Sequence, residues 1–149
     1  MSIIDGIIRL YGLKKSKIKG RFFKVGSKYY YVDIDNLNYL FNTLSRLDAN
    51  LINSIGLNIV DSRGRATIQF AKLVGREAKT NFVIVDYSEF IRFLKKGFIP
   101  KGDELESRGS HDIKILLVRL HEDIYPIGFV RECIDRYIFI IPKEFDTLI

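Results

Sequence analysis

The fold of this chain is decided by the stretch FVIVDYSEFIRFLKKGFIPK, residues 82–101. Its first four residues are β-branched or aromatic, which predicts a strand buried on both faces. Asp86 is a favourable N-cap for a helix, and Gly97 is a natural residue just beyond a helix C-terminus. The stretch therefore predicts a strand, a helix over 86–97 and a second strand beginning at Phe98. The apolar face of that helix is expected to hold Tyr87, Phe90, Ile91 and Leu94.

After this stretch the pattern is one of strands separated by turns. Apolar and β-branched runs predict the strands, and Gly, Pro and Ser mark the turns. The predicted strands are Ile113–Leu120, Ile127–Arg131 and Tyr137–Ile141, and the predicted turns are Pro100–Gly102, Ser107–Ser110 and Tyr125–Pro126.

Before this stretch, helices and hairpins alternate. Isoleucines at helical spacing predict a helix from Ile3 that stops at Gly12. Two β-rich runs, Arg21–Val25 and Lys28–Val32, are joined by Gly26-Ser27, which predicts a hairpin with a type II′ turn. The remaining predicted elements are a helix over 37–47 capped by Asp33 or Asp35, a hairpin of Ile55–Val60 with Ala66–Phe70, and a short helix over Ala71–Ala78.

Composition and charge divide the chain near residues 79–81. The 149 residues include 22 isoleucines and four alanines, which favours strands over a helical bundle. Residues 1–81 carry 14 Lys and Arg against six Asp and Glu, whereas residues 82–149 carry ten against 12. We therefore expect two modules, 1–81 and 82–149, that pack rigidly because the junction is too short for a flexible linker.

The basic stretch near the amino terminus predicts a polyanionic partner. No acid lies between Asp5 and Asp33, whereas eight basic residues do. Such one-sign density is typical of nucleic-acid binding, although a solvated lysine-rich face is the plainer alternative. The cations expected to add RNA affinity here are Lys14, Lys15, Lys17 and Lys19.

The common catalytic and cofactor motifs do not occur in the sequence. It lacks a GxxxxGK[ST] loop, a GxGxxG turn, a GxSxG elbow and an HExxH helix. One cysteine, Cys133, and two histidines predict neither a disulfide nor a metal site, and no cofactor is expected. The trio His121, Glu122 and Asp123 is expected at an exposed turn, and Cys133 as an inert thiol.

Two further groups have alternative interpretations. In the tyrosine triplet Tyr29–Tyr31, side chains on a strand alternate, so at least one ring is expected to be exposed, where it could stack on a base. Packing is the favoured reading for these rings. Arg63-Gly-Arg65 could contact phosphate, but an exposed loop tip is the favoured interpretation.

No apolar run approaches the ~20 residues of a membrane span, and the start of the chain carries no basic leader.

Several segments together resemble a known family. The strand, helix and glycine-marked strand of residues 82–101 resemble the opening of a PUA domain, a small RNA-binding barrel. The segment DIYPIGFV, residues 123–130, resembles the D-I-P-L-G-F-G-V stretch of the Nip-seven family of large-ribosomal-subunit biogenesis factors. Tyr125 adds one residue relative to that pattern. Tyr30–Val32, the following helix and the Ser54–Gly56 turn resemble the family's amino-terminal half.

This resemblance implies a fold and a function. The fold would be α+β, with a small α/β amino-terminal domain packed against a carboxyl-terminal PUA-like β-pseudobarrel. The protein would be a non-enzymatic factor that binds rRNA precursors alongside other ribosome-assembly or RNA-processing proteins. It would be cytoplasmic, or nuclear or nucleolar in a eukaryote. The RNA-binding positions carried over from the pattern are Lys95, Lys96, Gly97, Lys101, Arg131 and Arg136.

Two other functions stay open at this point. The first is a catalyst or specificity subunit of an RNA-modification system, because PUA modules are often fused to such enzymes. Its acidic candidates in the first half are Asp5, Asp33, Asp35, Asp48, Asp61 and Glu77. The second is a protein-docking module whose basic stretch binds an acidic partner.

Overall fold

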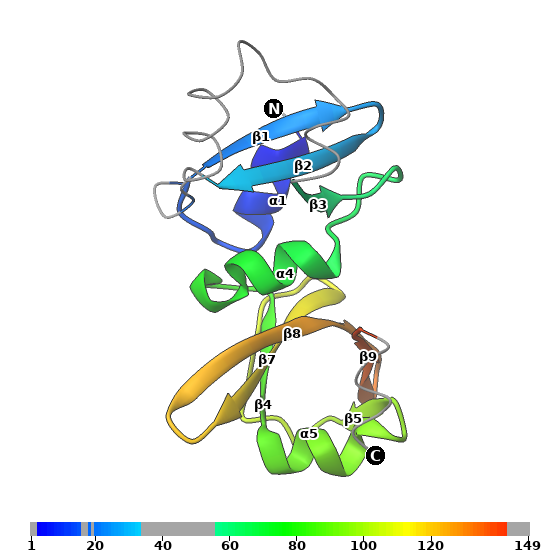
Figure 1. Ribbon diagram of the computed structural model, residues 1–149. Coiled ribbons are helices and arrows are strands. Elements are labelled where there is room, and N and C mark those ends of the chain that lie inside the picture. The colour runs from blue at the N-terminus through cyan, green and yellow to red at the C-terminus, as the bar shows by residue number, and fades with distance from the viewer. Residues whose placement is uncertain (1–2, 16–17, 19, 34–55, 143–149) are drawn as a thin grey trace.

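The computed structural model describes residues 3–15, 18, 20–33 and 56–142, and shows a mixed α+β fold with two sheets (Figure 1). Short helices accompany both sheets. The elements are α1 (Ile3–Leu10), β1 (Gly20–Val25), β2 (Lys28–Asp33), β3 (Leu57–Val60), α4 (Ile68–Val74), the 3₁₀ turn η2 (Gly75–Glu77), β4 (Phe82–Asp86), α5 (Tyr87–Leu94), β5 (Phe98–Pro100), β6 (Glu106–Arg108), β7 (Ile113–Leu120), β8 (Asp123–Glu132) and β9 (Arg136–Ile140).

The smaller sheet has the strand order β1-β2-β3 and confirms the first predicted hairpin. Val25 pairs with Lys28, so Gly26 and Ser27 form the two-residue turn. Gly26 has φ +64°, whereas Ser27 is not in the left-handed region, which is the type II′ pattern expected from the sequence. The predicted helix over 37–47 and the start of the second hairpin lie outside the described residues, as does most of the Ser54–Gly56 turn.

The larger sheet has the order β5-β9-β8-β7-β4-β6 and curls into a half-barrel (Figure 1). Only β4 and β7 pair in parallel, and the other neighbours are antiparallel. Helix α5 covers the inner face of the curl with Phe90, Phe93 and Leu94. These side chains pack on a cluster that includes Val83, Val85, Ile99, Leu116, Val118, Val130 and Tyr137.

Helix α5 forms much as its sequence predicts. The Asp86 side chain accepts a hydrogen bond from Ser88 N at 3.2 Å, which caps the helix. At the other end, Gly97 N–H donates to Phe93 O at 3.1 Å, with φ +81° at Gly97. One prediction is wrong: Tyr87 is 44% exposed, and Phe93 takes its place on the buried face.

The predicted strand Ala66–Phe70 is wrong. A single bridge joins Val60 to Ala66, and α4 begins two residues later. Thr67 Oγ1 accepts a hydrogen bond from Phe70 N at 3.3 Å and caps the helix. Phe70, Ala71 and Val74 then fall on one buried face, so tertiary burial at helical spacing overrides the β propensity of the segment. The predicted helix over 71–78 therefore starts at Ile68 and ends in η2.

Two predicted turns are partly strands. Residues 106–108 form β6, the edge strand that pairs with β4. Tyr125 and Pro126 lie inside β8, which extends from Asp123 to Glu132. Leu116 pairs with Gly128 and Leu117 pairs with Pro126, so Ile127 forms a bulge. The bulge accommodates a proline and one additional residue in a long strand without breaking it.

The two halves share one hydrophobic core. Ile4, Tyr11 and Phe70 belong to the same cluster as Ile115 and Phe129 from the half-barrel. The Tyr11 ring lies 6.2 Å from both Phe70 and Phe129, measured between centroids.

Residues 79–81, which connect the two halves, form hydrogen bonds to both of them. Asn81 Nδ2 donates to Leu10 O at 2.6 Å, and His111 N donates to Asn81 Oδ1 at 3.0 Å. Lys79 N donates to Tyr11 O at 3.0 Å. The residues that connect the halves in sequence therefore also fasten them in space.

Because the Tyr11 phenol is buried, we expect the stability of the protein to fall at alkaline pH. Its hydroxyl donates to Ile113 O at 3.3 Å, and burial, followed by the charge of Asp112, raises the pKa of Tyr11 to about 12 from 10.0. Folding therefore favours the neutral phenol. That contribution is complete below pH ~10 and is lost as the pH rises towards ~12, an effect of roughly 2–3 kcal/mol.

Urea unfolding of wild type and Tyr11→Phe at pH 8, 10 and 11.5 measures this contribution. Burial also raises the pKa of Tyr31 and Tyr137, so both proteins lose stability in alkali. We expect wild type to lose more, because only it titrates at Tyr11. Parallel losses in the two proteins would contradict this assignment.

No helix in the described part of the chain is long and apolar enough to cross a membrane.

Candidate nucleic-acid interface

The positions carried over from the PUA pattern gather around β5, an edge strand of the half-barrel. Phe98 pairs with Ile138, which in turn pairs with Arg131 on β8. Directly paired residues project from the same face of a sheet, so these three side chains form one row. Arg136 lies two residues before Ile138 and shares that face. We call Phe98, Arg131, Arg136 and Ile138 the outer row.

Within the outer row, Arg136 stacks on an aromatic ring. Its guanidinium carbon lies 4.4 Å from the Phe98 ring centroid. Stacking fixes the plane of a guanidinium while leaving its edges able to donate hydrogen bonds. The arrangement therefore combines an apolar platform with cations, which is the composition used for single-stranded nucleic acids.

The Arg136 guanidinium already forms an ion pair with the neighbouring carboxylate of Asp135. Its Nε lies 3.1 Å from Asp135 Oδ1, and its Nη2 lies 3.1 Å from Asp135 Oδ2. These hydrogen bonds lower the pKa of Asp135 below its ordinary value and raise that of Arg136. Asp135 is therefore ionised at neutral pH and competes with any phosphate for this guanidinium.

Lys101 lies on the opposite face of the sheet. The inner row across these strands is Ile99, Tyr137 and Glu132. Lys101 follows two residues after Ile99, and its ammonium is 5.6 Å from the Tyr137 ring and 3.9 Å from Glu132 Oε1. The structure therefore separates Lys101 from Arg131 and Arg136, which the sequence had grouped with it.

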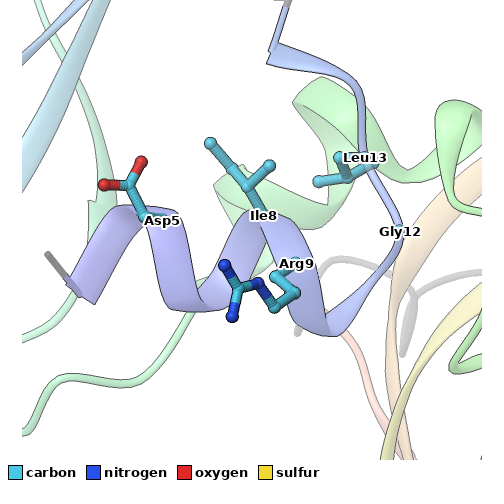
Figure 2. A pocket seen from close by; sticks show the side chains of 5 residues that line it. All are labelled: Asp5, Ile8, Arg9, Gly12 and Leu13. Carbon is cyan, nitrogen blue, oxygen red and sulfur yellow. The ribbon is translucent and has the colours of Figure 1, made fainter. Parts of the chain in front are cut away.

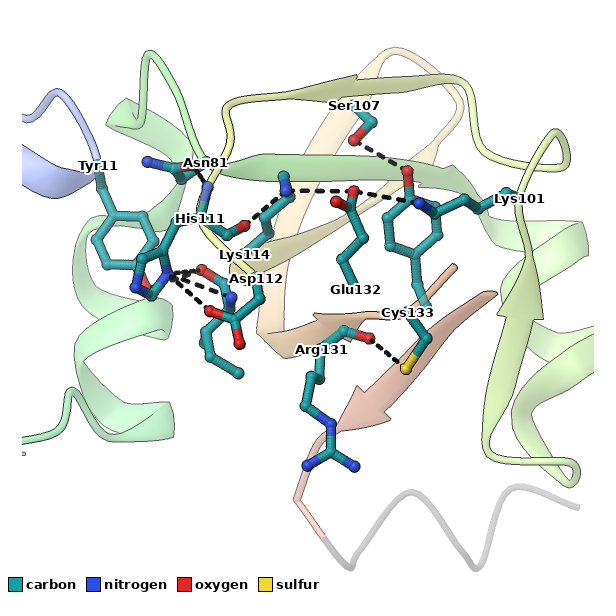
Figure 3. A network of polar contacts seen from close by, with 12 residues as sticks. Tyr11, Asn81, Lys101, Ser107, His111, Asp112, Lys114, Arg131, Glu132 and Cys133 are labelled. Atoms are coloured by element: carbon teal, nitrogen blue, oxygen red, sulfur yellow. Dashed lines mark hydrogen bonds and ion pairs between the residues drawn. The ribbon is translucent and has the colours of Figure 1, made fainter. Parts of the chain in front are cut away.

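A buried lysine holds the carboxylate that Lys101 approaches (Figure 3). Lys114 is 0% exposed, and its Nζ donates to His111 O at 2.6 Å and to Glu132 Oε1 at 3.2 Å. Tyr137 donates from its hydroxyl to Ser107 Oγ at 3.1 Å, which links β9 to the far edge strand β6. These contacts join β7 to β8 and β9 to β6 on the face of the sheet where Lys101 lies.

Glycines at both ends of β5 leave its backbone approachable. Gly97 and Gly102 have φ +81° and +104°, and a Cβ added at either would meet no atom within 4 Å. Gly97 O accepts from Phe139 N, and Lys101 N donates to Asp135 O. Along a strand, the backbone N–H and C=O groups of successive residues point alternately towards and away from the neighbouring strand. Since the C=O of Gly97 points towards β9, the N–H and C=O of Phe98 point away from it. That N–H is a donor that a phosphate could reach.

Lys95 and Lys96 lie at the C-terminal end of α5, next to this edge. Both are exposed, and Lys96 Nζ lies 5.5 Å from the Phe93 ring centroid. Within the described residues, neither of these lysines nor Arg131 is within ion-pair distance of a carboxylate. Of the cations carried over from the PUA pattern, Lys95, Lys96 and Arg131 are therefore the ones most available to phosphate.

The amino-terminal lysines are only partly described. Lys14 and Lys15 are exposed, and Lys15 Nζ lies 2.7 Å from Asp5 Oδ1. Lys17 and Lys19 lie outside the described residues. A shallow hollow at the end of α1 is lined by Asp5, Ile8, Arg9, Gly12 and Leu13 (Figure 2). An acid at this hollow offsets part of the positive charge that the sequence concentrates here.

The basic residues of the first hairpin do not form a single patch. Arg21 pairs with Val32, and Lys24 pairs with Tyr29, so the two cations project from opposite faces of β1. Tyr30 and Tyr31 are buried and Tyr29 is half-buried, with Lys24 Nζ 6.0 Å from the Tyr29 centroid. The expectation of an exposed ring is therefore wrong, and the packing interpretation holds.

The other singled-out residues lie in three separate places, and Cys133 is next to the outer row, because its N–H donates to Arg136 O at 2.8 Å. His121 and Glu122 form the turn between β7 and β8, Asp123 begins β8, and all three are exposed as expected. Cys133 is partly buried, with its Sγ 4.0 Å from Arg131 O. Arg63 is exposed in the loop between β3 and α4, where its N–H donates to Asp61 Oδ1. Among the described residues, no group of three or more His, Cys, Asp or Glu could hold a metal ion.

Sequence reasoning missed Phe98 as a stacking platform, and Asp135 and Glu132 as competing carboxylates. The Asp135-Arg136 neighbours were visible in the sequence. Their meaning depends on register, because a shift of one residue would turn Arg136 to the inner face.

If the β5 edge binds RNA, neutralising Asp135 should strengthen that binding. In Asp135→Asn, Arg136 loses its ionised partner, so we expect roughly threefold tighter binding and a salt slope steeper by about 0.7. Asp123→Asn makes the same change at the distant β7–β8 turn and should have little effect. Filter binding at several salt concentrations measures both variants. Equal affinities for Asp135→Asn and wild type would mean that Arg136 does not contact RNA.

No protein-family model and no curated protein matches this chain.

Proposed function

We propose that this protein is a non-enzymatic RNA-binding protein that acts on ribosomal RNA precursors during ribosome assembly. RNA would bind around the β5 edge of the half-barrel, which we propose to be a PUA-like pseudobarrel. The amino-terminal lysines would add affinity that does not depend on RNA sequence. Ribosome assembly itself rests on the resemblance of residues 82–101 and 123–130 to the Nip-seven family.

The observation that carries RNA binding is the composition of the β5 edge. The outer row supplies a stacked arginine and an aromatic ring, Lys95 and Lys96 lie at the adjoining helix end, and Gly97 leaves the backbone open. Cations that bind phosphate beside rings that stack on bases are the shared features of single-strand recognition. A backbone N–H at the open edge adds a donor that does not depend on a side chain.

Three of the described carboxylates, two in the half-barrel and one in the loop before α4, are held ionised by their hydrogen-bond partners. Hydrogen bonds from Ser88, then the charge of Arg119, keep the pKa of Asp86 below its ordinary value. Asp135 is held low by Arg136, and Asp61 by the Arg65 backbone. A general base works best with a pKa near neutrality, so these ionised, paired carboxylates are poorly suited to proton transfer.

A binding assay and a cellular experiment test this function together. Filter binding should detect pre-rRNA fragments at ~50 mM salt, with affinity falling steeply towards ~200 mM. Crosslinking in cells should place the protein on one region of the rRNA precursor. An absence of RNA binding at low salt, or crosslinks spread over unrelated RNAs, would contradict the proposal. Loss of an RNA modification in an Asp123→Ala or Cys133→Ala strain would instead favour the RNA-modification alternative.

A further inference from the structure

A second surface with a different chemistry lies where the two halves meet. A cavity of about 510 Å³ opens between α1, the loop that precedes α4, and the ends of β7, β8 and β9. Its walls are largely aliphatic and include Ile7, Leu10, Ile68, Ile113, Phe129 and Ile140. We call this cavity the junction groove. Its volume lies in the range of pockets that bind ligands.

One arginine lines the junction groove, and two more lie close to its lining residues. Arg65 lines it, Arg63 is in the same loop, and Arg131 is the cross-strand neighbour of the lining residue Ile113. Asp61 also lines it, but its carboxylate accepts from the N–H groups of Arg63 and Arg65 and pairs with Arg65 Nε at 3.4 Å. Asp112, next to the lining residue His111, is a further acid near the groove.

The sequence of the amino-terminal half, which supplies two walls of the groove, is basic, whereas residues 82–149 carry ten Lys and Arg against 12 Asp and Glu. In residues 1–81, Lys and Arg exceed Asp and Glu by 14 to six. An acidic segment would be drawn to this half of the molecule, whereas a basic one would be repelled.

The polar groups of the groove are mostly occupied, which disfavours a nucleobase. Thr67 Oγ1 donates to Asn58 O and accepts from Phe70 N, and the Tyr11 hydroxyl donates to Ile113 O. Among the described polar side chains that line the groove, His111 Nε2 and the two Nη atoms of Arg65 have no hydrogen bond to the described part of the protein. A base edge buried there would lose hydrogen bonds to water without replacement, whereas an aliphatic side chain would not.

From this geometry we infer that the junction groove binds an acidic, amphipathic segment of a partner protein. Leucine, isoleucine, methionine or phenylalanine side chains of that segment enter the groove. Its Asp and Glu residues meet Arg63, Arg65 and Arg131 at the rim. This is the recognition mode of an amphipathic helix in an apolar groove. The inference does not depend on the proposed RNA function.

Display selection with full-length protein identifies the chemistry of the occupant. A library of random peptides of about 15 residues, long enough to form a helix when bound, is selected against wild type. Enriched sequences should carry apolar residues at helical spacing next to Asp and Glu. Enrichment of basic or wholly polar sequences, or of none, would overturn the inference.

The same substitution at two isoleucines, one in the groove and one outside it, tests whether the peptide binds in the junction groove. Ile140 lines the groove and is 40% exposed, whereas Ile134 is 97% exposed at the β8–β9 turn. Fluorescence anisotropy with an enriched peptide should show at least tenfold weaker binding to Ile140→Asp and less than twofold change for Ile134→Asp. Ile140→Ser is the second variant if Ile140→Asp does not fold. Unchanged affinity in the folded Ile140 variant would refute the site.

A second matched pair tests the charge of the rim. Arg63→Glu should weaken peptide binding roughly fivefold at low salt, while Lys28→Glu, on the far hairpin, should not. If Arg63→Glu and Lys28→Glu weakened peptide binding equally, the effect of Arg63 would come from the net charge of the protein alone. That result would overturn the assignment of Arg63 to the rim.

Two other occupants have their own signatures. If RNA displaces the peptide and Ile140→Asp also weakens RNA binding, the groove holds RNA. The chain's last residues include Phe145 and Leu148 beside Glu144 and Asp146. If Phe145→Ser with Leu148→Ser tightens peptide binding tenfold, the occupant is this segment and not a partner. Either result would overturn the inference.

Discussion

Replacing Asn81 with alanine should destabilise the protein by about 3 kcal/mol, because three stabilising features meet at this residue. Asn81 is 7% exposed and donates to Leu10 O while accepting from His111 N. Its φ of +54° is in the left-handed region, which asparagine tolerates better than alanine. Both buried hydrogen bonds and the backbone preference are lost together in Asn81→Ala.

The variant Asn81→Gly separates these contributions. Glycine adopts the same φ without strain, so Asn81→Gly should lose about 2 kcal/mol, chiefly through the two hydrogen bonds. Urea unfolding followed by circular dichroism and by tyrosine fluorescence measures both variants. We expect one transition with coincident probes, because the two halves share a core. Separate transitions for the two probes, or a loss below 1 kcal/mol in Asn81→Ala, would contradict the role of Asn81 as a fastener of the junction.

RNA affinity should fall by roughly 50-fold between ~50 and ~200 mM salt if about four phosphates are contacted, since the single-strand slope is near −0.7 per contact. The variants then show which surface makes these contacts. Lys101→Ala/Arg131→Ala/Arg136→Ala should lose discrimination between pre-rRNA fragments and random RNA. Simultaneous Lys→Ala changes at 14, 15, 17 and 19 should weaken both RNAs about equally.

The structure adds a division of the first set. Arg131 and Arg136 are on the outer row, and Lys101 is on the inner face with Tyr137. Testing Arg131→Ala/Arg136→Ala apart from Lys101→Ala shows which face reads the RNA, and we expect the outer row to dominate. Arg92→Ala/Arg119→Ala removes the same charge from arginines paired with Glu89 and Asp86. If the outer-row double variant behaves like this control, the β5 edge is not the RNA surface.

Local signals in the sequence were enough to predict several elements correctly. Helix α5 needed only a cap, a periodic apolar face and Gly97, all within twelve residues. The first hairpin needed only Gly26-Ser27 between two β-rich runs, and β7 was predicted at its observed bounds. In each case the interactions that fix the element are close in sequence, so propensity and periodicity suffice.

Elements whose state depends on distant partners were predicted less well. Residues 66–70 carry a β-favouring pattern, but Thr67 caps a helix because Phe70, Ala71 and Val74 bury their side chains together. Residues 106–108 become a strand only because β4 offers an edge to pair with. Neither outcome can be read from the segment alone, because the deciding contacts come from other parts of the chain.

The same division holds for the candidate site. The sequence by itself was enough to predict which cations are candidates for the site, that Gly97 follows the end of α5, and that residues 1–81 carry an excess of positive charge. Only the tertiary structure decided that Arg131 and Arg136 share a face with Phe98 while Lys101 lies on the other. It also decided that Asp135 and Glu132 engage two of these cations and that the two halves enclose the junction groove. The physical reason is that strand register assigns each side chain to a face, and register is fixed by long-range pairing and burial.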